Sequence, residues 1–173
     1  MVNVITLEFI KKAHAGQYYG SQPYFNHPVE VMHKVDALCS NVNNPELNSS
    51  HVTINDWFKM RKVMMQVALL HDVIEDTIYT ADTLRLKFSS DVVTAVELLT
   101  KDVMLSYRSN IQRIIDSANI IAMFVKLADN LVNRSNDKTK FSLDKAMSLN
   151  ARYDMSIDML KSALKLYGYN LHL

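Results

Sequence analysis

Only three glycines and three prolines occur among the 173 residues of this chain. In average proteins the two residues together make up about 12% of the sequence. Because strand-rich folds need frequent turns, and turns favour these two residues, their scarcity disfavours sandwiches and barrels and indicates long helices. The sequence therefore predicts an all-α fold.

Apolar residues recur at helical spacing along most of the chain, and capping residues divide them into about seven helices with no convincing strand. We interpret Thr6 as the start of the first helix and Gly16 as its stop, with an irregular segment over residues 17–26. Pro28 fits the first position of a second helix, because its missing N–H costs nothing there. A polar segment over residues 40–50 is expected to be a loop.

A long helix is predicted to follow, with Thr53 as its cap and with its apolar positions continuing through Ile74. One or two helices are predicted between Tyr107 and Arg134, the later part being very apolar. The other start and stop signals are Thr80, Ser90, Ser142 and Gly168.

Length and composition favour one globular domain over residues 1–173, with no linker or repeat. The one cysteine, Cys39, allows no internal disulfide and no zinc site built on several cysteines. The longest apolar stretch, residues 120–125, is far shorter than the ~18 residues of a membrane span. The N-terminus lacks the charged-then-apolar order of a signal peptide. We therefore expect a cytoplasmic protein.

The formal net charge of +1 gives the chain no bulk field that would attract nucleic acid or an anionic membrane. A local basic patch is still compatible with this charge. We expect neither nucleic acid nor membrane among the partners, and the sequence does not predict an oligomeric state.

Four ionisable residues interrupt an otherwise apolar run over residues 64–77. If the helix were continuous, His71, Asp72, Glu75 and Asp76 would share one arc of about 140°. Crowded carboxylates repel one another, and buried ones need a proton or a cation, which a divalent metal would supply. The same arc is also compatible with a solvated face near a helix end. The residues alone leave both interpretations open.

Asp129 follows a second apolar run, with Lys126 one turn before it and Asn133 one turn after it. A surface ion pair between Lys126 and Asp129 explains this pattern, and so does a further metal ligand. His27 precedes Pro28 at a rigid helix entrance, where capping, packing and ligation are all possible roles. Two imidazoles and two carboxylates together suit manganese, iron or zinc.

Four segments carry a resemblance to a known family when they are taken in order: residues 13–17, 23–28, 68–77 and 125–133. They resemble the HD-domain metal-dependent phosphohydrolases, and within these the (p)ppGpp hydrolase group, which comprises the RelA/SpoT hydrolase domain and the small, Mesh1-like alarmone hydrolases. The resemblance covers roughly residues 5–165. The ten-residue block around the His-Asp pair is its most specific part.

This resemblance implies a helical HD fold that holds one divalent ion, usually manganese in this group. The ligands that it implies are His27, His71, Asp72 and Asp129. The reaction of the group removes the 3′-pyrophosphate of guanosine tetra- or pentaphosphate by attack of a metal-activated water.

The resemblance also assigns the other site residues. Glu75 and Asp76 match the catalytic pair that positions and deprotonates the attacking water, and Asn133 matches a contact to ribose or phosphate. Tyr19 stands near the place of an arginine that stacks on guanine in the group, so the family's base specificity does not transfer directly. Apart from the resemblance, nearby cations are expected to offset charge on the departing pyrophosphate, and the candidates are Lys126, Arg134, Lys138, Lys140 and Arg152.

Three functions follow as hypotheses. The leading one is a stand-alone guanosine-3′,5′-bis(diphosphate) 3′-pyrophosphohydrolase. The second is an HD phosphohydrolase that acts on another nucleotide, such as a nucleoside monophosphate or a phosphorylated dinucleotide. The third is an HD module that binds metal and nucleotide without hydrolysis, against which the retained Glu75 and Asp76 argue.

Overall fold

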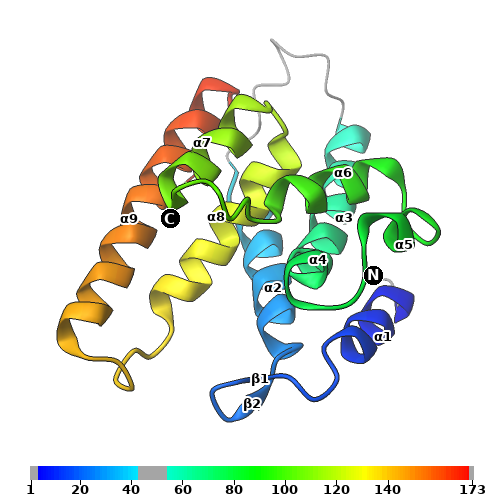
Figure 1. Cartoon of the computed structure of the whole chain (residues 1–173). Helices are drawn as coiled ribbons and strands as arrows, with labels where there is room; N and C mark the ends of the chain where they lie inside the picture. The colour runs from blue at the N-terminus through cyan, green and yellow to red at the C-terminus, as the bar shows by residue number, and fades with distance from the viewer. Residues whose placement is uncertain (1–3, 43–53, 172–173) are drawn as a thin grey trace.

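The structure is a computed structural model that describes residues 4–42 and 54–171. Nine helices and one short hairpin make up these two ranges (Figure 1). Seven of these helices have ten residues or more, and the other two, α4 and α5, have only four and five. The predicted all-α class is therefore confirmed, with the hairpin as a small addition. The elements in chain order are α1 (Val4–Ala13), β1 (Tyr18–Tyr19), β2 (Gln22–Pro23), α2 (Asn26–Ser40), α3 (Ile54–Leu70), α4 (Val73–Asp76), α5 (Ala81–Arg85), α6 (Ser90–Leu99), α7 (Tyr107–Asp116), α8 (Ile120–Ser135) and α9 (Leu143–Leu166).

Helix α8 lies at the centre of the core. Its apolar run makes it buried on most sides, and it packs against α2, α3, α6, α7 and α9. Figure 1 shows α8 and α9 side by side as an antiparallel pair, with α2 and α3 next to them. At one end of this bundle the ring of Phe124 contacts Trp57 and Tyr169, with centroid distances of 6.0 and 5.4 Å. The polar residues of α8 are thereby held at fixed positions.

Several predicted helix boundaries are confirmed. The Thr80 side chain accepts a hydrogen bond from the Thr83 amide at the start of α5, and Ser142 caps α9 through the Lys145 amide. Gly168 follows α9 with a φ of +86°, a left-handed conformation that favours glycine. These signals act locally, so the sequence is sufficient to locate them.

Other local predictions are wrong. Thr6 is not a cap, because α1 begins at Val4 and the buried Thr6 hydroxyl accepts a hydrogen bond of 3.0 Å from Gln66 of α3. Pro28 is the third residue of α2 rather than its first. Ser90 is the first residue of α6, and Ser89 holds the cap position.

The segment expected to be irregular contains a hairpin. Tyr18 pairs with Pro23 and Tyr19 with Gln22, and a tight turn with Gly20 at a φ of +65° joins the two strands. In Figure 1 the hairpin projects beyond the N-terminal end of α2. The cap predicted at Thr53 and most of the predicted loop over residues 40–50 lie outside the described residues.

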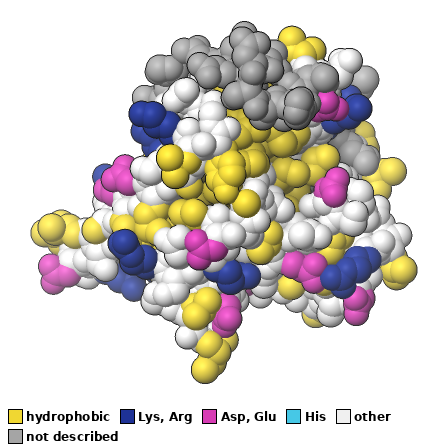
Figure 2. Space-filling view, turned by 90° about the horizontal axis from the view of Figure 1, so that it is seen from above, with side chains coloured by type: hydrophobic (Ala, Val, Ile, Leu, Met, Phe, Trp, Pro, Cys, Tyr) yellow, Lys and Arg dark blue, Asp and Glu magenta, His cyan; other side chains and the backbone are white. Residues whose placement is uncertain are grey.

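No helix in the described part of the chain is long and apolar enough to cross a membrane. The face shown in Figure 2 carries basic and acidic side chains interspersed among apolar ones. Among the described residues on this face, neither sign forms a large patch. This distribution agrees with the small net charge of the chain.

Candidate metal centre

A break between α3 and α4 creates the first part of the site. The predicted long helix ends at Leu70, and His71 and Asp72 lie in a turn before α4. The prediction that four ionisable residues share one arc of a continuous helix is therefore wrong. His71 Nδ1 lies 2.8 Å from the Ala68 carbonyl oxygen, to which it donates. This bond fixes the ring and leaves Nε2 as the nitrogen that could bind a metal.

Three segments bring two imidazoles and two carboxylates together. His27 comes from the start of α2, Asp129 from α8, and His71 and Asp72 from the turn. His27 Nε2 lies 3.3 Å from Asp129 Oδ1, and His71 Nε2 lies 3.0 Å from Asp72 Oδ2. The atoms of His27, His71 and Asp72 that could bind a metal ion all lie within 4.8 Å of one another.

The electrostatics of this cluster suit a cation. Burial alone would lower the pKa of His71, but the Asp72 carboxylate raises it to about 9. Burial alone would raise the pKa of Asp72, but His71 holds it at about 2. His71 Nε2 is a buried nitrogen without a hydrogen bond. The donor atoms and this orphaned nitrogen therefore fit one divalent ion with nitrogen and oxygen ligands.

Lys126 and Asn133 hold the Asp129 carboxylate in place. Lys126 Nζ lies 2.9 Å from Asp129 Oδ2, and Asn133 Nδ2 donates to Asp129 Oδ1 at 2.6 Å. The ion pair considered from the sequence therefore exists, but it is not a surface pair, because Asp129 is only 4% exposed. Although burial would raise the pKa of Asp129, Lys126 and the two imidazoles hold it far below its usual range. Asp129 is therefore a carboxylate that stays ionised.

Tyr24 joins two of the predicted site residues and was not singled out from the sequence as a site residue. Its hydroxyl lies 2.6 Å from Asp72 Oδ2 and 3.0 Å from Asp76 Oδ2. Burial and the Asp72 carboxylate raise the pKa of Tyr24 well above its usual value, so the hydroxyl keeps its proton and donates. Tyr24 lies three residues before His27 in the sequence, and this closeness to a predicted ligand is the signal from which its role could have been predicted.

Replacing Tyr24 with phenylalanine removes this hydroxyl and keeps the ring. Because outer contacts of this kind orient a ligating carboxylate, we expect Tyr24→Phe to weaken metal binding or turnover about 10-fold or more. Titration of the metal-free protein with Mn²⁺ measures the first effect. Tyr18→Phe is the matched control, since Tyr18 is in the hairpin that precedes Tyr24 and is 69% exposed. Equal metal affinity and turnover in both variants would contradict this role.

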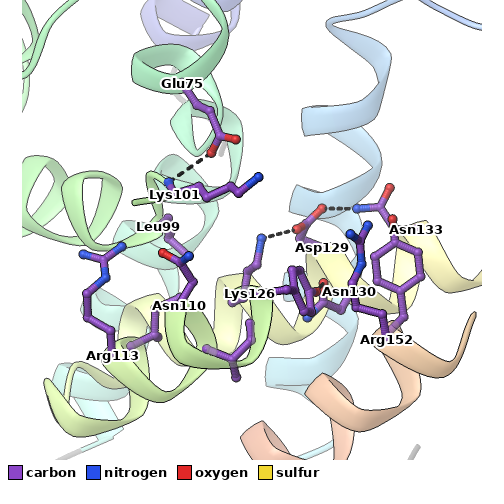
Figure 3. Close-up of a pocket in the computed structure, with 14 residues that line it drawn as sticks. Glu75, Leu99, Lys101, Asn110, Arg113, Lys126, Asp129, Asn130, Asn133 and Arg152 are labelled. Atoms are coloured by element: carbon purple, nitrogen blue, oxygen red, sulfur yellow. Dashed lines mark hydrogen bonds and ion pairs between the residues drawn. The ribbon is translucent and has the colours of Figure 1, made fainter. Parts of the chain in front are cut away.

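A cavity of about 210 Å³ adjoins the cluster, and Asp129 and Glu75 contribute to its wall (Figure 3). The Glu75 carboxylate accepts a hydrogen bond of 3.1 Å from the Lys101 backbone amide. Four cationic side chains also line the cavity: Lys101, Arg113, Lys126 and Arg152. The cavity therefore combines two acidic groups, Asp129 of the cluster and Glu75, with a basic wall.

Two of these four cations are available to a ligand. Lys126 is paired with Asp129, and Arg113 Nη2 donates to the carbonyls of Leu98 and Thr100 at 3.1 and 2.7 Å. Within residues 4–42 and 54–171, neither Lys101 nor Arg152 forms an ion pair with an acidic side chain. Such unpaired cations on a cavity wall suit phosphate groups.

The other predicted substrate residues occupy different places. Asn133 and Lys126 line the cavity, but Arg134 does not, and its Nε donates to Asp154 at 2.7 Å. Tyr19 lies outside the cavity lining, with its ring stacked on His27 at a centroid distance of 5.6 Å.

The loop after α8 approaches the outer part of Tyr19. Lys140 Nζ lies 5.3 Å from the centroid of the Tyr19 ring, and Asn136 donates to the Tyr19 hydroxyl at 3.3 Å. Lys138 instead donates to backbone carbonyls at the end of α8. Of the predicted cations, Lys140 thus contacts the Tyr19 ring, whereas Lys126 and Arg152 line the cavity.

The chain is similar in sequence to two curated proteins. No family model matches the chain. The chain is 30% identical over 133 residues to the guanosine-3′,5′-bis(diphosphate) 3′-pyrophosphohydrolase of Haemophilus influenzae, an alignment that covers 71% of this chain and 17% of the relative. It is 32% identical over 114 residues to the mouse guanosine-3′,5′-bis(diphosphate) 3′-pyrophosphohydrolase MESH1, which covers 64% of this chain and 54% of that protein. The chain thus spans about half of one curated relative and about a sixth of the other.

The fold of the chain is similar to that of a solved structure. It is that of a metazoan orthologue of SpoT that hydrolyses ppGpp, with a TM-score of 0.60 and 21% identity over 94% of this chain and 95% of that one. The resemblance inferred from the motifs is therefore confirmed: in sequence and in fold, the chain is similar to the HD-domain proteins of the (p)ppGpp hydrolase group.

Proposed function

We propose that the chain is a metal-dependent hydrolase that removes pyrophosphate from the 3′ position of guanosine-3′,5′-bis(diphosphate). The observation that carries this proposal is the imidazole–carboxylate cluster at the edge of a cavity with two unpaired cations, Lys101 and Arg152. A nucleotide with several phosphates complements such a wall. The names of the two curated relatives support the same substrate.

In this proposal His27, His71, Asp72 and Asp129 hold one divalent ion. When bound, such an ion lowers the pKa of a water molecule and withdraws charge from a phosphoryl oxygen. Manganese is the metal proposed, because the family resemblance implies it and because two imidazoles and two carboxylates suit it as ligands. The ordered contacts of His71 and Asp129 support a site that is already arranged before the ion binds.

The chain's own residues then supply the proton transfer and the charge stabilisation. Glu75 and Asp76 are exposed carboxylates one turn beyond His71 and Asp72, where they can accept a proton from the attacking water. Lys101 and Arg152 offset the negative charge of the phosphate groups. The reaction adds water across the bond between the 3′ oxygen and phosphorus, so the products are guanosine 5′-diphosphate and pyrophosphate.

Tyr19 is proposed to contact the base in place of a cationic residue. A neutral ring stacks on every base, so we expect the adenine analogue of ppGpp to be turned over within about tenfold of ppGpp itself. Tyr19→Ala is expected to raise KM more than it lowers kcat, since stacking acts alike on substrate and transition state. Steady-state kinetics on both nucleotides measure these effects. Rejection of the adenine analogue would contradict the role of Tyr19.

A nucleotide panel tests the proposed function against its alternatives. Purified protein with Mn²⁺ is incubated with ppGpp, its adenine analogue, nucleoside monophosphates and a phosphorylated dinucleotide. Cleavage of ppGpp supports the proposal, whereas cleavage of a monophosphate or dinucleotide alone would indicate an HD hydrolase of another specificity. Binding without cleavage of any member would indicate a sensing module. The single domain over residues 1–173 and the cytoplasmic location are further parts of the proposal.

A further inference from the structure

A polar triad joins three helices at the cavity wall: Asn130 of α8 and the half-buried Tyr107 of α7, which both line the cavity, and Ser156 of α9. Asn130 is 1% exposed and Ser156 is fully buried. Asn130 donates from Nδ2 to Ser156 Oγ, and its Oδ1 accepts a hydrogen bond of 2.8 Å from the Tyr107 hydroxyl. A buried amide is costly unless both of its halves are bonded, so these contacts fix where the Tyr107 hydroxyl lies.

The ring of Tyr107 contacts the guanidinium of Arg152. Arg152 Cζ lies 4.6 Å from the Tyr107 ring centroid and 5.4 Å from that of Tyr153. In Figure 3 Arg152 reaches toward Asp129 and Asn133 on the cavity wall. An exposed arginine without an acidic partner would otherwise sample many rotamers, and the two rings restrict them.

We propose that Tyr107, held by Asn130 and Ser156, is a positioning residue that presents the Arg152 guanidinium to a phosphate group of the substrate. The identity of the substrate in this inference rests on the proposed function. A guanidinium that is already oriented loses less conformational freedom when it binds a phosphate. Tyr107 therefore acts through Arg152 and strengthens binding of substrate and transition state alike.

Two conservative substitutions test this role. Tyr107→Phe keeps the ring and removes the bond to Asn130, whereas Arg152→Lys keeps the charge and removes the planar group. The dissociation constant of inorganic pyrophosphate is measured by calorimetry on metal-loaded protein freed of excess Mn²⁺, and KM and kcat are measured with ppGpp. We expect the dissociation constant and KM to rise about threefold in Tyr107→Phe and about tenfold in Arg152→Lys, with the kcat of Tyr107→Phe within about twofold of wild type.

The double variant separates positioning from a merely structural role. If Tyr107 acts through Arg152, Tyr107→Phe has no further effect on pyrophosphate binding in the Arg152→Lys background, whereas additive effects would contradict the inference. Arg108→Lys is the matched control, because Arg108 is exposed on the same helix and is not part of the cavity lining. Unchanged binding and KM in both single variants would also overturn the inference.

This design distinguishes the inference from the proposed function. If the wild type does not cleave ppGpp, the proposed function is overturned. If the two substitutions still weaken pyrophosphate binding in a coupled, non-additive way, the role of Tyr107 is supported. Cleavage of ppGpp with an unchanged KM in both variants would support the proposed function and overturn the role of Tyr107.

Discussion

Asp129→Ala is expected to lower the metal content of the purified protein from about one ion per chain to less than about a tenth of that, and to abolish turnover. Asp129 is the buried carboxylate that contacts His27 and accepts bonds from Lys126 and Asn133. Its loss removes one of the four proposed ligands and leaves the Lys126 ammonium, which is only 20% exposed, without its partner. Elemental analysis of the dialysed protein measures the metal content.

The stability of the metal-free protein supplies a second measurement. Removing one partner of a buried ion pair leaves an uncompensated charge, so we expect the free energy of unfolding of metal-free Asp129→Ala to fall by about 3 kcal/mol. Asp36→Ala is the control, because Asp36 pairs with Arg61 away from the cluster. Full metal occupancy in both Asp129→Ala and Asp72→Ala would contradict the ligand assignment.

Glu75→Gln and Asp76→Asn are expected to lower kcat by about 10²-fold or more while metal content and melting temperature stay close to wild type. Both changes keep size and hydrogen-bond acceptance, so the bonds from the Lys101 amide and the Tyr24 hydroxyl persist. The negative charge and, with it, the capacity to take a proton are lost. Single-turnover kinetics and elemental analysis separate these two effects.

Glu97→Gln provides the control for this pair. Glu97 accepts a hydrogen bond of 2.6 Å from Arg85 and is not part of the cavity lining. We therefore expect the turnover of Glu97→Gln to equal that of wild type. Wild-type turnover in both Glu75→Gln and Asp76→Asn would place the proton acceptor elsewhere.

The helical class was predictable because the signals for it are local. Glycine and proline are scarce, and caps such as Thr80 and Ser142 act within one turn of their helix. The break at His71 and Asp72 was not predictable in this way, since apolar spacing continues across it with no glycine or proline to mark it. Tertiary packing overrides local propensity there.

The candidate site was predictable only in part. Residues close in sequence, such as Lys126, Asp129 and Asn133, were grouped correctly because they share one face of α8. The approach of His27 to Asp129 spans about a hundred residues, and only the family resemblance indicated it. Lys101 and Tyr107 were missed as site residues, because nothing in their local sequence marks a residue that faces a cavity formed by other helices.

Product analysis after incubation with ppGpp tests the central claim most directly. The protein is freed of metal, reconstituted with one equivalent of Mn²⁺, and compared with the metal-free form and with Glu75→Gln. We predict equimolar guanosine 5′-diphosphate and pyrophosphate from the reconstituted wild type, with at least about 10²-fold less product from Glu75→Gln. Intact ppGpp after incubation with the reconstituted wild type, or release of orthophosphate in place of pyrophosphate, would contradict the claim.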